Sequence, residues 1–339
     1  MGVIPTVANL KKYAPGVRVD VLIHKESAEL IAFSPDIGNV WEYDRRAAKQ
    51  SLFSTAFYHL KLIGKLRREK YDIVIALTQG DRAVFLSFAT GAPVRLIYQS
   101  SNNISNMFMN AFANAEAPRR HFIEHDVDIL SYFGIENREI EPRVMIPDSV
   151  RSKIRERLHS NDTGQINVVI HPGARKTTRQ WPPERFAEIA CRLRAYDQVS
   201  ILLLGGPGDE NLLEEIERPM GFKAAFKSCE VSLLEMAALF SECHLFIGND
   251  SGPGHIAAAV GCATLSLFGP NYPDSCRPYT SRGEVIFKNL PCCGCRQEEE
   301  LCVRPDNTCM ELIEVDEVWE KVNVMLSSPS FVQTTRGGV

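Results

Sequence analysis

The sequence predicts an α/β protein of two domains, each built around a parallel sheet. Its 339 residues are enough for two domains of ordinary size. Short apolar runs rich in β-branched residues alternate with amphipathic segments, which is the pattern of βα units. A polar stretch with two prolines, residues 134–165, separates two such series. We therefore expect domains at 1–150 and 151–327 that face a central cleft, with a ligand at the carboxyl ends of the strands.

The composition excludes several classes of protein. Hydrophobic residues make up 45% and charged residues 24%, and the net charge is −4, so the chain as a whole has no attraction for nucleic acid. No run of apolar residues reaches the length of a membrane span, and the first residues lack the pattern of a signal peptide. All ten cysteines lie at or after Cys191, unlike a small secreted scaffold. These features predict a reduced, cytoplasmic protein.

In the first half, strands are expected at residues 17–23, 72–77 and 94–98. Helices are expected at 53–68 and at 121–133, the second ending at Gly134, a typical C-cap residue. Phe53, Phe57 and Tyr58 have helical spacing, and we expect them to pack inward.

The second half repeats the alternation more regularly. Strands are expected at 166–171, 199–204, 244–247 and 263–268, and helices at 183–196, 210–217, 233–240, 251–260 and 315–326. The tail, residues 328–339, is expected to be disordered.

The strongest motif, residues 246–259, places a tight polar turn between a strand and a helix of small residues. Gly252 and Gly254 leave backbone N–H groups accessible at a helix N-terminus, which attracts a diphosphate. Ser251 can cap the helix or bind a phosphate oxygen, and His255 can donate to the same anion. The alternative is a well-capped buried helix without a ligand.

Two further strand ends carry polar residues suited to the same ligand. After the strand at 166–171 come Arg175, Lys176 and Arg179, cations that suit a diphosphate, although a solvated basic loop is the alternative. Trp181 is expected in the core in either case. After the strand at 199–204, Asp209 and Glu210 can bind a ribose hydroxyl, or Asp209 can cap the next helix.

Three segments resemble glycosyltransferase family 9, the ADP-heptose:lipopolysaccharide heptosyltransferases. They read His-Pro-Gly-Ala-x4-Arg-x-Trp-Pro from residue 171, Asp-Ser-Gly-x2-His-x-Ala-Ala from 250 and Phe-Gly-Pro from 268. Weaker similarity at 72–95 and 121–134 extends the resemblance over nearly the whole chain. Within the family, the resemblance favours the second or third type of core heptosyltransferase.

The resemblance implies a GT-B fold, with two Rossmann-like domains, an ADP-heptose donor on the C-terminal domain and a lipopolysaccharide inner-core acceptor on the N-terminal one. It also implies a direct displacement at the anomeric carbon with inversion, and this reaction needs no metal for catalysis. Asp250 would orient the donor sugar, and Arg179 would neutralise the diphosphate. Both residues would therefore support catalysis electrostatically. The implied donor-binding residues are Gly173, Ala174, Arg175, Arg179, Glu210, Asp250, Ser251, Gly252, Pro253, Gly254 and His255.

The N-terminus departs from the family pattern. The family begins with a strand and a Gly-Asp turn whose Asp is the expected catalytic base, whereas residues 3–11 here resemble the helix that follows that turn. Alignment places the Asp before Met1. We expect a start site assigned too late rather than an inactive member, because loss of a central strand would expose unpaired backbone. Asp81 is the best-placed carboxylate in the sequence, although it can simply cap a helix.

The loop at 292–309 contains a Cys-x-x-Cys pair and two later thiols. Cys292, Cys295, Cys302 and Cys309 could bind a structural zinc ion, and we favour the alternatives of local disulfides or reduced thiols.

The acceptor site is not identified by any motif. Basic clusters at Arg45, Arg46 and Lys49, or at Arg119, Arg120 and His121, are candidates that more often form a solvated surface. We expect a monomer that does not bind nucleic acid and whose lipid-anchored acceptor is compatible with peripheral contact at the inner membrane. The alternative functions are a non-catalytic nucleotide-sugar-binding homologue, a GT-B transferase using another nucleotide sugar, and an epimerase-like enzyme.

Overall fold

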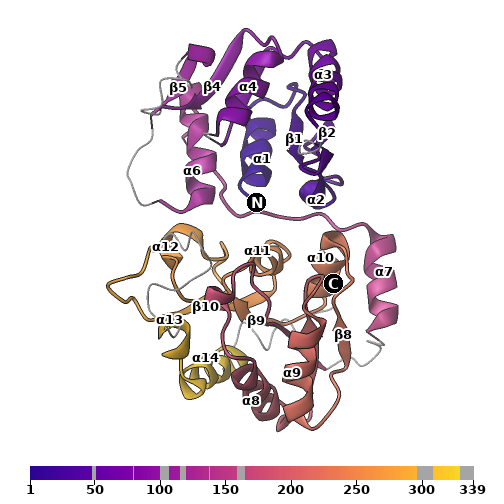
Figure 1. Cartoon of the computed structure of the whole chain (residues 1–339), viewed down its shortest axis with the longest axis vertical. Helices are drawn as coiled ribbons and strands as arrows, with labels where there is room; N and C mark the ends of the chain where they lie inside the picture. Colours follow the sequence, from indigo (N-terminus) through magenta and orange to yellow (C-terminus); the bar gives the residue numbers. More distant parts are fainter. Residues whose placement is uncertain are drawn as a thin grey trace. The chain divides into compact units, whose positions relative to one another are not determined.

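The computed structural model describes residues 1–47, 51–78, 80–99, 107–114, 120–136, 138–158, 165–295 and 308–328. The chain divides into two compact units, Met1–Pro142 and Arg143–Val339, each with helices packed on parallel strands (Figure 1). The division falls within the polar stretch at 134–165. In the described ranges, no helix combines the length and apolar character needed to cross a bilayer.

The described residues of the N-terminal unit form two parallel sheets. β1 (Asp20–His24) pairs with β2 (Asn39–Tyr43), and β4 (Val94–Tyr98) pairs with both β3 (Ile73–Ala76) and β5 (Ala111–Ala113). The three predicted strands are thus confirmed with small shifts, whereas β2 and β5 were not predicted. The upstream Gly-Asp turn stays a prediction.

The helices of this unit have the following bounds: α1 Val3–Tyr13, α2 Lys25–Ala28, α3 Leu52–Arg68, α4 Asp81–Ala89 and α6 Phe122–Asp128. α3 confirms the predicted helix at 53–68. The predicted helix at 121–133 is α6 followed by a 3-10 helix, Ile129–Phe133. It ends at Gly134, whose φ of 74° is the left-handed conformation that glycine adopts without strain.

The expectation that Phe53 and Phe57 pack inward is wrong. Both side chains are exposed on α3, whereas Tyr58 packs against the cluster of Tyr43, Leu62 and other residues. The helical period correctly placed the two phenylalanines on one face, but no described residue covers that face.

The C-terminal unit contains one six-stranded parallel sheet in the order β11-β10-β9-β6-β7-β8. The strands are β6 Ile166–His171, β7 Val199–Leu204, β8 Phe226–Ser228, β9 Leu245–Asn249, β10 Ala263–Phe268 and β11 Gly283–Phe287. The predicted strands β6, β7 and β10 are confirmed to the residue. They are almost continuously apolar because parallel strands are covered on both faces.

Helices complete this unit, and the five predicted ones are confirmed within a few residues. The helices are α7 Asp148–Arg157, α8 Pro183–Arg194, α9 Glu210–Met220, α10 Leu233–Ser241, α11 Gly252–Ala259, α12 Pro273–Cys276, α13 Thr308–Glu311 and α14 Val315–Ser327. The tail predicted to be disordered lies outside the described residues after Ser328.

The strand order identifies where a ligand can bind this sheet. The chain runs from β6 outward to β7 on one side, and β9 later pairs with β6 on the other. The adjacent crossovers therefore diverge between β6 and β9, and the carboxyl ends of these two strands are where open parallel sheets bind ligands.

Candidate functional site

The carboxyl ends of β6 and β9 are held together by a close backbone contact. The register pairs His171 with Gly248, and a Cβ atom at Gly248 would lie 2.7 Å from the carbonyl oxygen of His171. Only glycine fits this position, since real Cβ atoms do not approach backbone oxygen so closely. The two loops that follow these strands therefore start side by side.

Asn249, the last residue of β9, ties the second loop to the first. Its Nδ2 donates to the carbonyl oxygen of Pro172 at 2.6 Å, and its Oδ1 accepts from the backbone N–H of Trp181 at 3.1 Å. Trp181 is buried and its indole donates to the carbonyl oxygen of Ile313, so its predicted place in the core is confirmed. Asn249 was missed by the sequence analysis, although an amide at a strand end is suited to bracing two loops.

Asp250 lies in a polar cluster at the end of β9. Its Oδ2 accepts from Nη1 of Arg179 at 3.3 Å and from Nδ2 of Asn271 at 2.6 Å. Burial raises the pKa of Asp250, and Arg179 and Asn271 partly offset this effect. The structure thus brings together two predicted site residues, and it adds Asn271, which follows β10 and was not identified from the sequence.

The N-terminus of α11 begins directly beside this cluster. Ser251 occupies the N-cap position but makes no side-chain cap, and its buried Oγ has no hydrogen-bond partner in the described structure. The first N–H groups of a helix have no partner within the helix and attract an anion. The capping alternative for Ser251 is therefore not realised. A phosphate oxygen could accept hydrogen bonds from both the Ser251 hydroxyl and the first N–H groups of α11.

The end of β7 approaches the same region through Asp209. A Cβ atom at Gly173 would lie 2.3 Å from Oδ2 of Asp209, so these two loops are in contact. Oδ2 of Asp209 accepts from the N–H of Gly206 at 2.8 Å, and the side chain does not cap α9. Asp209 therefore braces its own loop, and the exposed Glu210 is the carboxylate accessible to a ligand.

The remaining predicted donor residues follow the same strand ends. The backbone of Ala174 accepts from the side chain of Gln180 at 3.1 Å, and Arg175 is exposed. His255 lies half-buried in the first turn of α11. All the predicted donor residues thus follow the carboxyl ends of β6, β7 and β9, as listed here: Gly173, Ala174, Arg175, Arg179, Glu210, Asp250, Ser251, Gly252, Pro253, Gly254 and His255.

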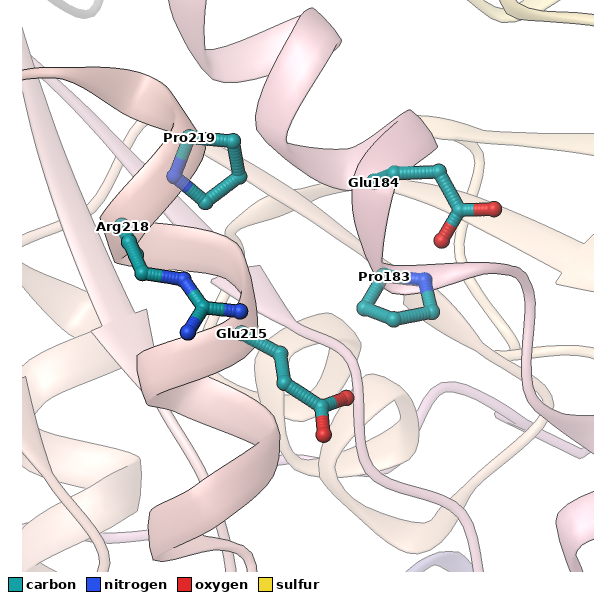
Figure 2. Close-up of a pocket in the computed structure, with 5 residues that line it drawn as sticks. All are labelled: Pro183, Glu184, Glu215, Arg218 and Pro219. Carbon is teal, nitrogen blue, oxygen red and sulfur yellow. The ribbon is translucent and has the colours of Figure 1, made fainter.

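A separate hollow of about 330 Å³ lies elsewhere in the C-terminal unit (Figure 2). It is lined by Pro183 and Glu184 at the start of α8 and by Glu215, Arg218 and Pro219 on α9. None of the predicted donor residues lines it, and its adjacent carboxylates do not suit a diphosphate.

The thiol cluster is only partly described, because Cys302 lies outside the described residues. Cys309 is buried, and Cys292 and Cys295 are half-buried free thiols. Within the described ranges, no group of three or more potential ligands is placed to hold a metal ion. The zinc site stays a prediction.

Three described members of the basic clusters in the N-terminal unit make local contacts. Arg45 binds the ring of His24, Arg120 pairs with Asp128, and His121 is buried at the N-cap of α6, where it accepts from the N–H of Ile123. Lys49 and Arg119 lie outside the described residues. Asp81 lies in the first turn of α4 and stays a candidate without an assigned role.

Comparison with known proteins identifies the family. The family model described as glycosyltransferase family 9 (heptosyltransferase) matches residues 59–303. The chain belongs to glycosyltransferase family 9. Among the relatives of this family 9 chain, lipopolysaccharide heptosyltransferase 3 of Escherichia coli is 27% identical over 283 residues, which cover 82% of each chain.

Solved structures of this family show the same fold. A glycosyltransferase family 9 protein from Veillonella parvula superposes with a TM-score of 0.85 at 21% identity, over 96% of this chain and 93% of that one. The E. coli heptosyltransferase WaaC with ADP superposes with a TM-score of 0.74 at 16% identity, over 96% and 95%. The predicted GT-B fold of this family 9 member is therefore confirmed.

Proposed function

We propose that this family 9 chain is an inverting glycosyltransferase that transfers heptose from ADP-heptose to the lipopolysaccharide inner core. The relatives named heptosyltransferase 3 favour the second or third core type. The observation that carries the proposal is the cluster of Arg179, Asp250 and Asn271 beside the unpartnered Ser251 Oγ at the start of α11.

The geometry suits the charge changes of such a transfer. An acceptor hydroxyl attacks the anomeric carbon from the face opposite the diphosphate, the bond from that carbon to the phosphate oxygen breaks, and ADP leaves with the bonding electrons. The hydroxyl proton passes to a general base, for which the Gly-Asp turn of the family pattern stays the predicted source. Arg179 and the N–H groups of α11 stabilise the charge that develops on the diphosphate.

Asp250 and Asn271 fit a second role in the same step. A heptose presents several hydroxyl groups, and a buried carboxylate accepts hydrogen bonds from two of them with strict geometry. Asn271 binds Oδ2 of Asp250 and so orients the carboxylate toward the sugar. Asp250 is therefore proposed to select and orient the donor sugar rather than to bind the nucleotide.

Nucleotide titration of thermal stability tests the donor half. A nucleotide present at about 100 times its Kd stabilises the native state by about 2.7 kcal/mol, which raises Tm by about 5–10 °C in a unit of this size. ADP should produce this shift, and UDP and GDP should produce a much smaller one. Arg179→Ala should remove the ADP shift.

The matched control is Arg155→Ala. It removes an arginine–carboxylate pair with Glu242 in the same unit, away from the donor residues, so it should leave the ADP shift intact. Selective stabilisation by UDP or GDP would instead support a transferase using another nucleotide sugar. ADP-heptose binding without release of ADP in the presence of core acceptor would support a non-catalytic homologue.

A further inference from the structure

The N-terminal half of α3 presents an apolar stripe to solvent. The exposed fractions are 91% for Phe53, 70% for Phe57 and 68% for Leu60. These positions are spaced four and three residues apart, so they lie on one face of the helix. The opposite face, with Leu62 and Leu66, packs in the core of the unit. α3 lies at an edge of the N-terminal unit (Figure 1).

The same face of α3 carries only positive charge. The helix contains no acidic residue. Lys61 and Arg68 are exposed and continue the stripe toward the C-terminal end of the helix, whereas the exposed Lys65 lies about 120° from Phe53 around the helix axis. Nζ of Lys65 lies 5.9 Å from the centroid of the Trp41 ring, so its stem also packs on the unit. An apolar half and a cationic half therefore follow each other along one exposed face.

Exposing a stripe of large apolar side chains to water is unfavourable. Together with its cationic flank, this stripe suits the surface of an anionic bilayer. Apolar residues on one face and lysine or arginine beside them are characteristic of helices that lie in the interface of an anionic bilayer. Phenylalanine and leucine enter the acyl boundary, and the cations contact lipid phosphates.

We propose that α3 docks the protein on an anionic phospholipid surface. Phe53, Phe57 and Leu60 insert at the acyl boundary, while Lys61 and Arg68 contact the phosphates. Charge complementarity favours this occupant over a second copy of the chain, because α3 contains no acidic residue that could pair with the cations of a second α3. The proposal goes beyond the glycosyl transfer and needs neither donor nor acceptor, so its failure would leave the proposed function untouched.

Vesicle flotation with the full chain tests this docking. Vesicles of phosphatidylglycerol mixed with phosphatidylcholine should carry the protein to the top of the gradient, and pure phosphatidylcholine vesicles should carry much less. Phe53→Ser combined with Phe57→Ser should lower the partition coefficient at least about tenfold. Lys61→Glu should lower it by about fivefold or more, and only with the anionic vesicles.

Matched controls come from exposed positions of the C-terminal unit. Val324→Ser on α14 changes an exposed apolar residue, and Arg218→Glu on α9 makes the same change in net charge as Lys61→Glu. Both should leave flotation unchanged. Because Phe53, Phe57 and Lys61 are exposed, their variants should keep the wild-type Tm, and Lys61→Glu remains informative if the double variant unfolds.

The other outcomes overturn the proposal. Wild-type protein that does not float with anionic vesicles has no such docking surface. Flotation that the α3 variants leave unchanged must use another surface. A dimer in solution that the α3 variants convert to monomer, without vesicle binding, would show that a second copy covers α3.

Discussion

The contact between Arg179 and Asp250 can be removed from either side without a large change in shape. Arg179→Met keeps the apolar stem of the arginine, and Asp250→Asn keeps the size of the carboxylate. The Oδ1 atom of an asparagine can still accept from Asn271, which binds Oδ2 of Asp250 at 2.6 Å in the wild type. The two single variants and the double variant form a cycle that isolates this one pair.

The expected coupling is modest although the atoms are close. At 3.3 Å and an effective dielectric constant of about 20, the Coulomb attraction is about 5 kcal/mol. The side chain of Arg179 is 27% exposed and that of Asp250 is 8% exposed, so solvent screens one end, and desolvation of the carboxylate opposes the attraction. We expect a net coupling of about 1–2 kcal/mol at pH 7.

The pKa of Asp250 determines whether the destabilisation by Arg179→Met grows or shrinks with pH. Burial raises the pKa of Asp250 in the native state, so the folded protein binds this proton more readily than the unfolded chain. Stability is therefore lost as the pH rises from the ordinary value of 3.8 through the raised value. Removing Arg179 raises the native pKa further, so the destabilisation of Arg179→Met should be larger at pH 7 than below pH 3.8.

Urea unfolding of the four proteins at both pH values provides the measurement. A coupling within error of zero at pH 7 would refute the assignment of a significant ion pair. A coupling that is equal at the two pH values would show that the charge of Asp250 is not involved.

Three further perturbations have defined outcomes. Gly248→Ala should destabilise the protein by about 2–3 kcal/mol, because its Cβ would lie 2.7 Å from the carbonyl oxygen of His171. Glu217→Gln should cost about 2 kcal/mol at pH 7 and only a small part of this at pH 2, because two lysines outweigh burial and lower the pKa of Glu217 from 4.5 to about 2, so its contribution is lost as the pH falls through this window. Asn271→Ala should raise the KM for the sugar donor about tenfold and leave ADP binding unchanged, because it frees Asp250 to rotate. Urea unfolding measures the first two, and steady-state kinetics with ADP titration measure the third.

Each of these variants has a control or a contradicting result. Gly64→Ala, at a helix position with open space around the added Cβ, should be stabilising rather than destabilising. Glu214→Gln removes a carboxylate that binds Lys227 but is exposed, so it should change stability by less than about 0.5 kcal/mol. An equal loss of stability for Glu217→Gln at pH 7 and pH 2 would exclude the ion pairs as its cause. Equal weakening of ADP and sugar-donor binding by Asn271→Ala would contradict its role in orienting Asp250.

The sequence by itself determined the fold class, the regular elements of the C-terminal unit and the family. β6, β7 and β10 were predicted to the residue because strands buried on both faces are apolar runs with sharp ends. The three polar strand ends followed from the same reasoning, since residues after parallel strands share one edge of the sheet, and the family resemblance implied the full set of donor residues. The family motifs occur in contiguous segments, so they too were readable without a structure.

Only the tertiary structure decided which of these strand ends are neighbours. The pairing of β6 with β9 brings Arg179 to Asp250, and Asn271 reaches the same carboxylate from the end of β10. The exposure of Phe53 and Phe57 was likewise decided by packing. Helical and strand periods depend on local geometry, and they show which residues share a face. What covers that face depends on contacts between residues far apart in the chain, which a local pattern does not encode.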